Sequence, residues 1–236
     1  MDAAFVLVHS PSVGPATWTP VAERLPGPVL VPSLLDVADS PPPFWPRVVE
    51  LVRKAISELP AGQPVIVAVH SNAGLFVPLI VEASTRPVAG CVFVDAALPA
   101  RTEATPVAPP ELIRFLEPKL GDDGRLPQWT AWWDEADVAP MFPDPETRRR
   151  VEAEQPRLPL SYYRQLIPVA PGWDRRPCAY LLFGPPYDEV AEDARGRGWD
   201  VTEIPGHHLH ELVDPDAVAA HLIAFREKDP QAKGLH

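Results

Sequence analysis

Six short runs rich in strand-forming and mostly apolar residues occur along the chain, and segments with helical periodicity separate most of them. The runs span residues 5–9, 29–32, 65–70, 91–95, 178–183 and 201–204, and the clearest helical patterns span 45–59, 73–84 and 189–197. Strands that are apolar throughout are typical of a parallel sheet covered on both faces, and helices between them supply right-handed crossovers. We therefore predict an α/β fold whose mostly parallel sheet has about six strands and is flanked by helices.

Residues 100–175 interrupt this alternation, because they carry helical patterns but no convincing strand. Four of the seven tryptophans and a tyrosine pair lie there. One interpretation is a peripheral helical layer whose aromatic rings fill its own small core. The interpretation we favour is an apolar substrate pocket, since large rings with a polar edge are typical of ligand sites. The pocket candidates are Trp129, Trp132, Trp133, Tyr162 and Tyr163.

Length and composition limit the class of protein. A chain of 236 residues suits one domain with a sizeable core, and its net charge of −11 argues against nucleic acid as a partner. Cys91 and Cys178 lie inside apolar runs, so we expect buried, unpaired thiols, as in a reducing cytoplasm. No signal peptide and no membrane-spanning run is recognised, so we expect a cytoplasmic location without membrane contact.

The third apolar run ends at Ser71, where the sequence reads Val69-His70-Ser71-Asn72-Ala73-Gly74 before a second apolar stretch. A buried strand that stops at a serine and passes directly into a helix is typical of a nucleophile elbow, a strained turn that exposes the serine hydroxyl. The usual pattern is G-x-S-x-G, from which Val69 and Ala73 depart. The context nevertheless predicts Ser71 as a nucleophile.

Two further segments, one before and one after Ser71 in the chain, carry histidines at the ends of predicted strands. The first run leads into His9-Ser10-Pro11, and the last run leads into Gly206-His207-His208. Together the three segments resemble the α/β-hydrolase family over roughly residues 4–226, with the nucleophile, the acid and the histidine following in that order. The resemblance implies a core of residues 1–99 and 176–227, a helical cap over the active site at 100–175, and a polar tail at 228–236. The family usually opens with an antiparallel hairpin before the strand that carries the first histidine. Here that strand begins within five residues of Met1, so we expect the hairpin to be missing.

The catalytic base implied by the resemblance lies on the loop after the last strand. In the family, the catalytic histidine is commonly followed seven positions later by a proline that opens the last helix. Counting back from Pro215 gives His208, and His207 is the alternative.

The acid is less well defined. The family usually places it three residues after a glycine, but that position here is Tyr187, and Asp188 follows one residue later. We favour Asp188 and keep two alternatives open, namely Asp95 at the end of the preceding run and a dyad that lacks a carboxylate.

An oxyanion hole requires two hydrogen-bond donors aimed at the developing negative charge. Asn72 offers the backbone N–H that directly follows the nucleophile. The family's second donor falls on Pro11, which has no N–H, and the preceding glycine is replaced by Ser10. A neighbouring amide, or the hydroxyl of Ser10 or Ser12, could take its place. In the hydroxynitrile lyase branch of the fold, a hydroxyl-bearing residue at the position of Ser10 holds the substrate oxygen.

These features predict a cofactor-independent serine hydrolase that cleaves a small or medium apolar ester or thioester through an acyl-serine. Two other functions remain open: a lyase or cyclase of specialised metabolism, and a ligand-binding protein without turnover. No metal-ligand or nucleotide-binding motif is recognised, so we expect no cofactor and no metal. The expected partner is a small apolar molecule, and the chain is a monomer or a homodimer.

Overall fold

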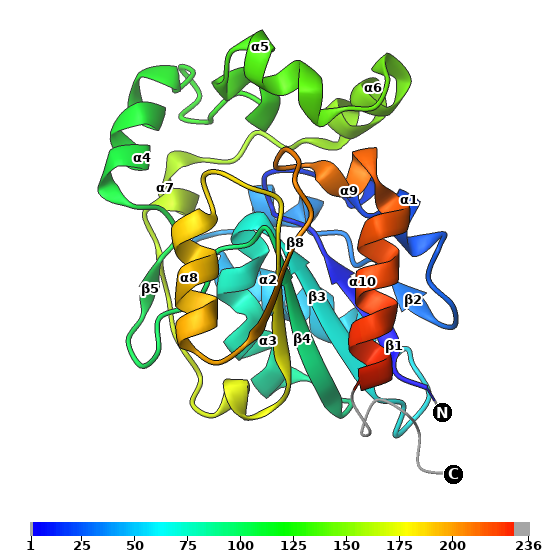
Figure 1. Cartoon of the computed structure of the whole chain (residues 1–236). Helices are drawn as coiled ribbons and strands as arrows, with labels where there is room; N and C mark the ends of the chain where they lie inside the picture. Colours follow the sequence, from blue (N-terminus) through cyan, green and yellow to red (C-terminus); the bar gives the residue numbers. More distant parts are fainter. Residues whose placement is uncertain (1, 229–236) are drawn as a thin grey trace.

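The computed structural model describes residues 2–228 and contains a six-stranded sheet in which every pairing is parallel (Figure 1). The strands follow the order β2-β1-β3-β4-β7-β8. Their bounds are β1 Ala4–Val8, β2 Val29–Leu30, β3 Val65–His70, β4 Val88–Val94, β7 Cys178–Leu182 and β8 Asp200–Glu203. The predicted α/β fold and its parallel sheet are confirmed. All of the predicted tail except Lys228 lies outside the described residues.

Helices cover both faces of the sheet, so successive side chains of each strand are buried on opposite sides. Phe5 and Leu7 belong to a cluster that includes α1 (Thr19–Ala22) and α10 (Pro215–Lys228). Val6 and Val8 belong to the cluster on the other face. The helices of that face are α2 (Trp45–Ser57), α3 (Val77–Ala83) and α8 (Asp188–Gly196). In Figure 1, α10 lies in front of the strands and α2 lies behind them. This double burial explains why the central strands β1, β3 and β4 are almost entirely apolar, whereas the edge strand β8 is partly exposed and carries charged residues.

Residues between β4 and β7 form the segment that the sequence marks as helical. Its helices are α4 Pro110–Leu116, α5 Glu135–Val138, α6 Pro145–Glu154 and α7 Leu160–Tyr163. It also contains a small antiparallel pair that the sequence did not reveal, β5 (Thr105–Pro106) with β6 (Leu166–Ile167). Strands of two residues are too short to produce a period-two pattern. Figure 1 places α4, α5 and α6 above the sheet. The exact limits of the segment as a separate cap, 100–175, stay a prediction.

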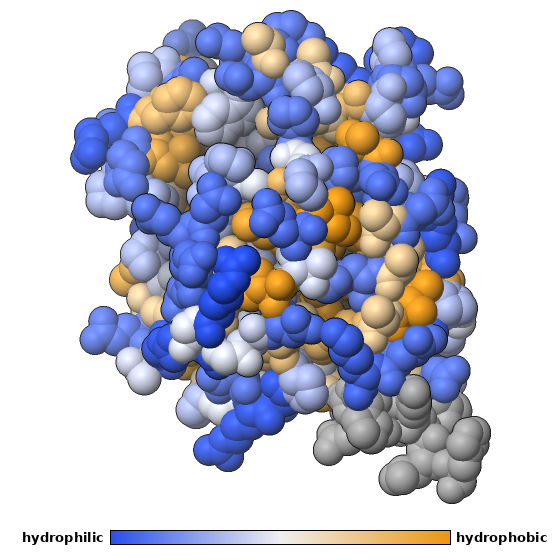
Figure 2. All heavy atoms as spheres, viewed as in Figure 1, coloured by the Kyte–Doolittle hydropathy of each residue, from blue (hydrophilic) through white to orange (hydrophobic). Residues whose placement is uncertain are grey.

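The remaining elements are short. Helix α9 spans His210–Val213. The 3-10 helices are η1 Pro15–Thr17, η2 Leu35–Asp39, η3 Ser71–Phe76, η4 Glu117–Lys119, η5 Trp129–Trp132, η6 Ala139–Met141 and η7 Trp173–Arg175. Cys91 and Cys178 face each other across β4 and β7 as free thiols. Hydrophilic residues cover most of the face seen in Figure 2, and hydrophobic atoms gather near its middle. Within residues 2–228, no helix has the length and apolar character needed to cross a membrane.

Candidate active site

Ser71 directly follows β3 as the first residue of η3, in a tight turn with a positive φ of 58°. A non-glycine residue in this region is strained and persists only where the surrounding structure holds it. The Ser71 carbonyl accepts a hydrogen bond of 3.0 Å from the N–H of Ala97. A Cβ on Gly74 would lie 2.0 Å from the Ala97 carbonyl oxygen, so this close approach requires glycine. The elbow therefore forms although Val69 and Ala73 replace the usual glycines.

The hydroxyl of Ser71 is the first member of a hydrogen-bonded chain that runs into the core. Its Oγ lies 2.9 Å from Nε2 of His208, and Nδ1 of His208 lies 2.6 Å from Oδ2 of Asp95. A carboxylate can only accept, so Nδ1 carries the proton and Nε2 faces Ser71 as a base. Asp95 is fully buried, and its Oδ1 accepts a hydrogen bond of 3.0 Å from the N–H of Phe183. This arrangement can move a proton from the serine to the imidazole.

The carboxylate that contacts His208 thus belongs to Asp95, which the sequence offered only as the alternative. Asp188, the acid favoured from the sequence, is the first residue of α8 and lines a separate surface depression. A helix N-terminus is a favourable place for a carboxylate, which explains Asp188 without a catalytic role. His207 is on the same loop as His208 and lines the cavity, but the imidazole bonded to Ser71 is that of His208.

Three aromatic rings surround the imidazole of His208. The ring of Tyr187 is stacked on it at 5.2 Å and 11°, His70 lies at 4.6 Å, and Trp129 lies at 5.8 Å. Burial raises the pKa of the Tyr187 hydroxyl to about 12, partly offset by the neighbouring Ser71 hydroxyl. The sequence did not reveal this contact, although Tyr187 stands at the spacing that the family uses for its acid. Because Asp95, directly after β4, supplies the carboxylate, position 187 can carry an aromatic ring that restrains the imidazole of His208.

The loop after β1 brings two hydroxyls to the site. Ser10 and Ser12 both line the cavity, and the N–H of Ser12 donates to Oγ of Ser10 at 3.3 Å. Pro11 lies between them and is buried. The loop is anchored by His9, whose Nε2 accepts from Leu34 N–H at 3.0 Å and whose Nδ1 donates to the Ser10 carbonyl at 2.8 Å. Burial lowers the pKa of His9 to about 4, which keeps it neutral. His9 is therefore a buried, hydrogen-bonded residue that fixes the loop.

The tyrosine pair of α7 forms hydrogen bonds to the start of η3 and to the loop after β1. The hydroxyl of Tyr162 donates to Oδ1 of Asn72 at 2.6 Å, and the hydroxyl of Tyr163 lies 2.6 Å from Oγ of Ser12. Asn72 also donates from Nδ2 to the carbonyl of Val107 at 3.1 Å. The segment between β4 and β7 is therefore bonded directly to the residues beside the nucleophile.

A cavity of about 400 Å³ opens above Ser71. Its lining is mainly apolar and aromatic, with few ionisable groups. The lining residues are Ser10, Ser12, Ser71, Asn72, Val107, Leu112, Trp129, Trp132, Trp133, Asp137, Met141, Tyr163, Pro185, Pro186, Tyr187, His207 and His208. Four of the five predicted pocket residues line it, whereas Tyr162 is fully buried behind the wall. Among residues 2–228 there is no group of three His, Cys, Asp or Glu side chains arranged to hold a metal ion.

Comparison with known proteins agrees with this architecture. The profile of the Alpha/beta hydrolase family matches residues 5–221, and the chain belongs to that family. None of the curated proteins matches the sequence.

Three solved structures illustrate the likeness of fold. One is an extracellular α/β-hydrolase from a Paenibacillus species, which is described as sharing structural and functional homology with tobacco salicylic acid binding protein 2. Its TM-score is 0.71, and it is 15% identical over 94% of this chain and 98% of its own. Polyneuridine aldehyde esterase has a TM-score of 0.68 and 16% identity over 95% and 99%. A variant of tomato methylketone synthase I complexed with beta-ketoheptanoate has a TM-score of 0.70 and 15% identity over 97% and 99%.

Proposed function

We propose that the protein is a serine hydrolase that cleaves a small or medium apolar ester or thioester. The observation that carries the proposal is the hydrogen-bonded chain from Ser71 through His208 to Asp95, whose open end faces the cavity. An alcohol becomes an effective nucleophile when a base removes its proton and a third group orients that base.

The reaction follows from the positions of the three side chains. Nε2 of His208 takes the hydroxyl proton as Oγ of Ser71 attacks the substrate carbonyl, and Asp95 stabilises the resulting imidazolium. His208 then protonates the leaving alcohol or thiol, which departs and leaves an acyl group on Ser71. In the second half-reaction, water attacks the acyl group and gives a proton to His208. His208 then returns that proton to Oγ of Ser71 as the acyl–Oγ bond breaks and the acid is released.

The negative charge on the carbonyl oxygen is stabilised by the backbone N–H of Asn72 and by the hydroxyl of Ser10. Ser10 Oγ already accepts from the N–H of Ser12, so its own proton is available for the substrate. This hydroxyl replaces the amide that Pro11 lacks. A preorganised donor of this kind is worth a few kcal/mol in the transition state.

The cavity indicates the size and polarity of the substrate. A volume of about 400 Å³ lies at the lower end of ligand pockets and suits a compact acyl group or alcohol. Tryptophan rings from the segment between β4 and β7 form much of the wall. In this proposal residues 100–175 act as a cap that shields the acyl-enzyme, and residues 1–99 and 176–227 form the catalytic core.

The proposal is tested with short p-nitrophenyl esters and a fluorophosphonate. The wild-type protein should release a burst of p-nitrophenol and gain one phosphonyl group by intact mass. Ser71→Ala should lose both, and Ser33→Ala, at an exposed serine, should keep both. Turnover that survives Ser71→Ala would remove the acyl-serine mechanism.

A second function on the same scaffold, a lyase or cyclase, is favoured by one observation. The loop after β1 presents two hydroxyls to the cavity, and Pro11 between them cannot donate. Such hydroxyls suit a substrate alcohol or ketone held during proton transfer. In that case Ser10→Gly should abolish activity, and no acyl adduct should form on Ser71. A hydrolase should lose only the few kcal/mol that one oxyanion donor supplies, and should still form the acyl adduct on Ser71.

A further inference from the structure

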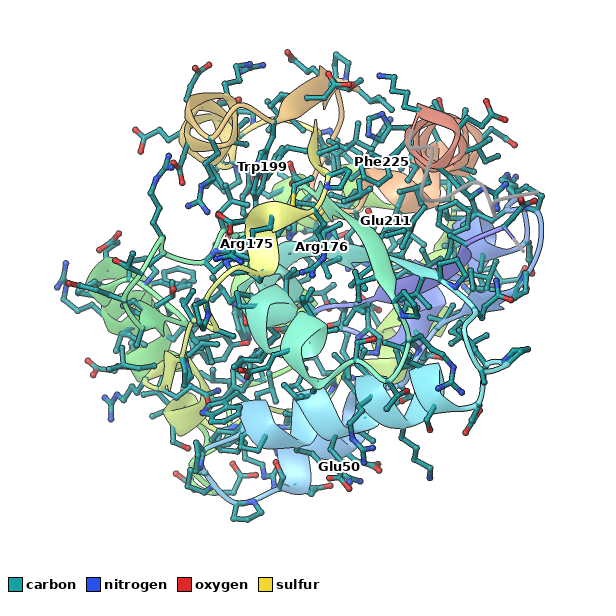
Figure 3. All side chains as sticks on the ribbon, turned by 90° about the horizontal axis from the view of Figure 1, so that it is seen from below. Glu50, Arg175, Arg176, Trp199, Glu211 and Phe225 are labelled. Carbon is teal, nitrogen blue, oxygen red and sulfur yellow. The ribbon has the colours of Figure 1, made fainter. Side chains whose placement is uncertain are left out.

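A carboxyl group and an imidazole lie buried behind His208 with no role in the reaction described so far. Glu211 of α9 and His70 at the end of β3 are 0% and 1% exposed. Oε1 of Glu211 lies 3.5 Å from Nδ1 of His70. Within the described residues neither carboxyl oxygen of Glu211, nor Nδ1 of His70, has a hydrogen-bond partner. In Figure 3, Glu211 lies in the interior and Glu50 lies near the outer edge. Burying an unpaired carboxyl group is costly, so this one requires an explanation.

His70 connects Glu211 to the base. Its Nε2 lies 2.7 Å from the backbone carbonyl oxygen of His208. A carbonyl only accepts, so Nε2 carries the proton and Nδ1 is left as an acceptor. Nδ1 faces Glu211, and the partner that would satisfy it must be a donor. A protonated carboxyl group is such a donor, and a carboxylate is not.

The surroundings favour uncharged forms of both groups. Burial, together with the negative charge of Asp95, raises the pKa of Glu211 well above its ordinary value. Burial, with the neighbouring His208 and His9, lowers the pKa of His70 well below its ordinary value. A neutral acid beside a neutral imidazole is thus the consistent state of the pair.

We propose that Glu211 is a positioning residue: its neutral carboxyl group donates a hydrogen bond to Nδ1 of His70, and His70 holds the backbone of His208. The present separation must shorten by about 0.5 Å to reach ordinary hydrogen-bond length. Held in this way, the imidazole of His208 stays between Ser71 and Asp95. The inference rests on the proposed function, because it concerns the base of that reaction.

Two substitutions separate donation from charge. Glu211→Gln keeps a donor of nearly the same shape, and Glu211→Leu removes it. We expect Glu211→Gln to keep kcat, and the rate of fluorophosphonate labelling at Ser71, within about threefold of wild type. Glu211→Leu should lower both by about tenfold or more and leave KM nearly unchanged, because alignment rather than substrate binding is lost. Val218→Ala, a buried change on neighbouring α10, controls for general loosening and should keep the labelling rate. Equal losses in Glu211→Gln and Glu211→Leu, or no loss in either, would overturn the proposal.

A stability measurement tests the same pair without activity. A carboxyl group that stays neutral in the folded protein but ionises in the unfolded chain lowers the free energy of unfolding. This loss grows as the pH rises above the pKa that the group has in the unfolded chain. Glu211→Gln lacks this penalty, so its gain in urea midpoint over wild type should grow between about pH 5 and pH 8. A constant difference would mean that Glu211 is not held neutral, and the proposal fails. If wild type does not react with the fluorophosphonate at all, the proposed hydrolase function fails, while the urea experiment still tests the pair.

Discussion

The carboxylate of Asp95 lies 2.6 Å from Nδ1 of His208 although 113 positions separate the two residues in the chain. Asp95 directly follows β4 and has a positive φ of 42°, and His208 follows β8 at the same edge of the sheet. The contact fixes which nitrogen of His208 carries the proton, and therefore leaves Nε2 free to accept from Ser71. Most of what we predict for the site depends on this pair.

Substitution of the two candidate acids should have very different effects. Asp95→Asn leaves the shape but removes the charge that stabilises the imidazolium, and should lower kcat by on the order of 10³-fold or more. Asp188→Asn, at the start of α8, should keep kcat within about twofold, since a surface substitution of this kind changes little. Steady-state kinetics with a p-nitrophenyl ester compares them. A large loss in Asp188→Asn alone would reassign the acid.

The hydrogen bond from Tyr162 to Asn72 should support the oxyanion site. Tyr162→Phe removes the hydroxyl at 2.6 Å from Oδ1 of Asn72 and leaves that partly buried acceptor without its partner, at a cost of about 0.5–1.5 kcal/mol in the free energy of unfolding. We expect kcat to fall several-fold with little change in KM, because the neighbouring N–H is aimed less well. Tyr180→Phe, which removes a buried hydroxyl bonded to the Ala96 carbonyl, is the matched control. It should lose stability but keep more of its kcat than Tyr162→Phe.

Gly74, the single glycine in the elbow sequence of residues 69–74, should not tolerate a side chain. An added Cβ would meet the Ala97 carbonyl oxygen at 2.0 Å, far inside contact distance, so Gly74→Ala must displace the backbone beside Ser71. We expect a loss of more than about 2 kcal/mol in the free energy of unfolding, together with a sharp drop in labelling at Ser71. Gly196→Ala at the end of α8 meets nothing within 4 Å and should behave as wild type. Tolerance of alanine at position 74 would contradict the described turn.

His9 should make the protein sensitive to acid. Burial lowers its pKa from 6.5 to about 4, so the unfolded chain binds a proton more readily than the folded one. The contribution of His9 to the free energy of unfolding is fully present above about pH 6.5. It is lost as the pH falls towards 4, and the total loss is about 3 kcal/mol. His9→Gln, which offers Leu34 an acceptor that does not titrate, should flatten this part of the stability curve. Urea unfolding between about pH 7 and pH 4.5 measures it, with the exposed His207→Gln expected to follow wild type.

Local patterns in the sequence were sufficient for the strands. All six apolar runs became strands of one parallel sheet, because a buried strand is recognisable from its own side chains. The helices predicted at 45–59 and 189–197 also formed, as α2 and α8. The two-residue strands β5 and β6 are too short to show a period and were not recognised; β2 is equally short but was recognised within the apolar residues 29–32.

The candidate site was predictable only where a local turn defines it. Ser71 was indicated by the strand before it and the helix after it, and His208 by its distance from Pro215. The choice between Asp95 and Asp188 was not accessible in this way, because both follow strands that end at the same sheet edge. The contacts of Tyr187 and Tyr162 were not predictable either, because the orientation of each ring is set by neighbours that are distant in the chain.

By itself, the sequence determined the kind of sheet, the position of the strained serine and the loop that carries the imidazole, since each depends on residues close together in the chain. Only the tertiary structure decided which carboxylate meets the imidazole, which rings enclose it and that a carboxyl group is buried behind it. Those relationships depend on strand register and on the path of the loops, and both are set by packing across the whole core.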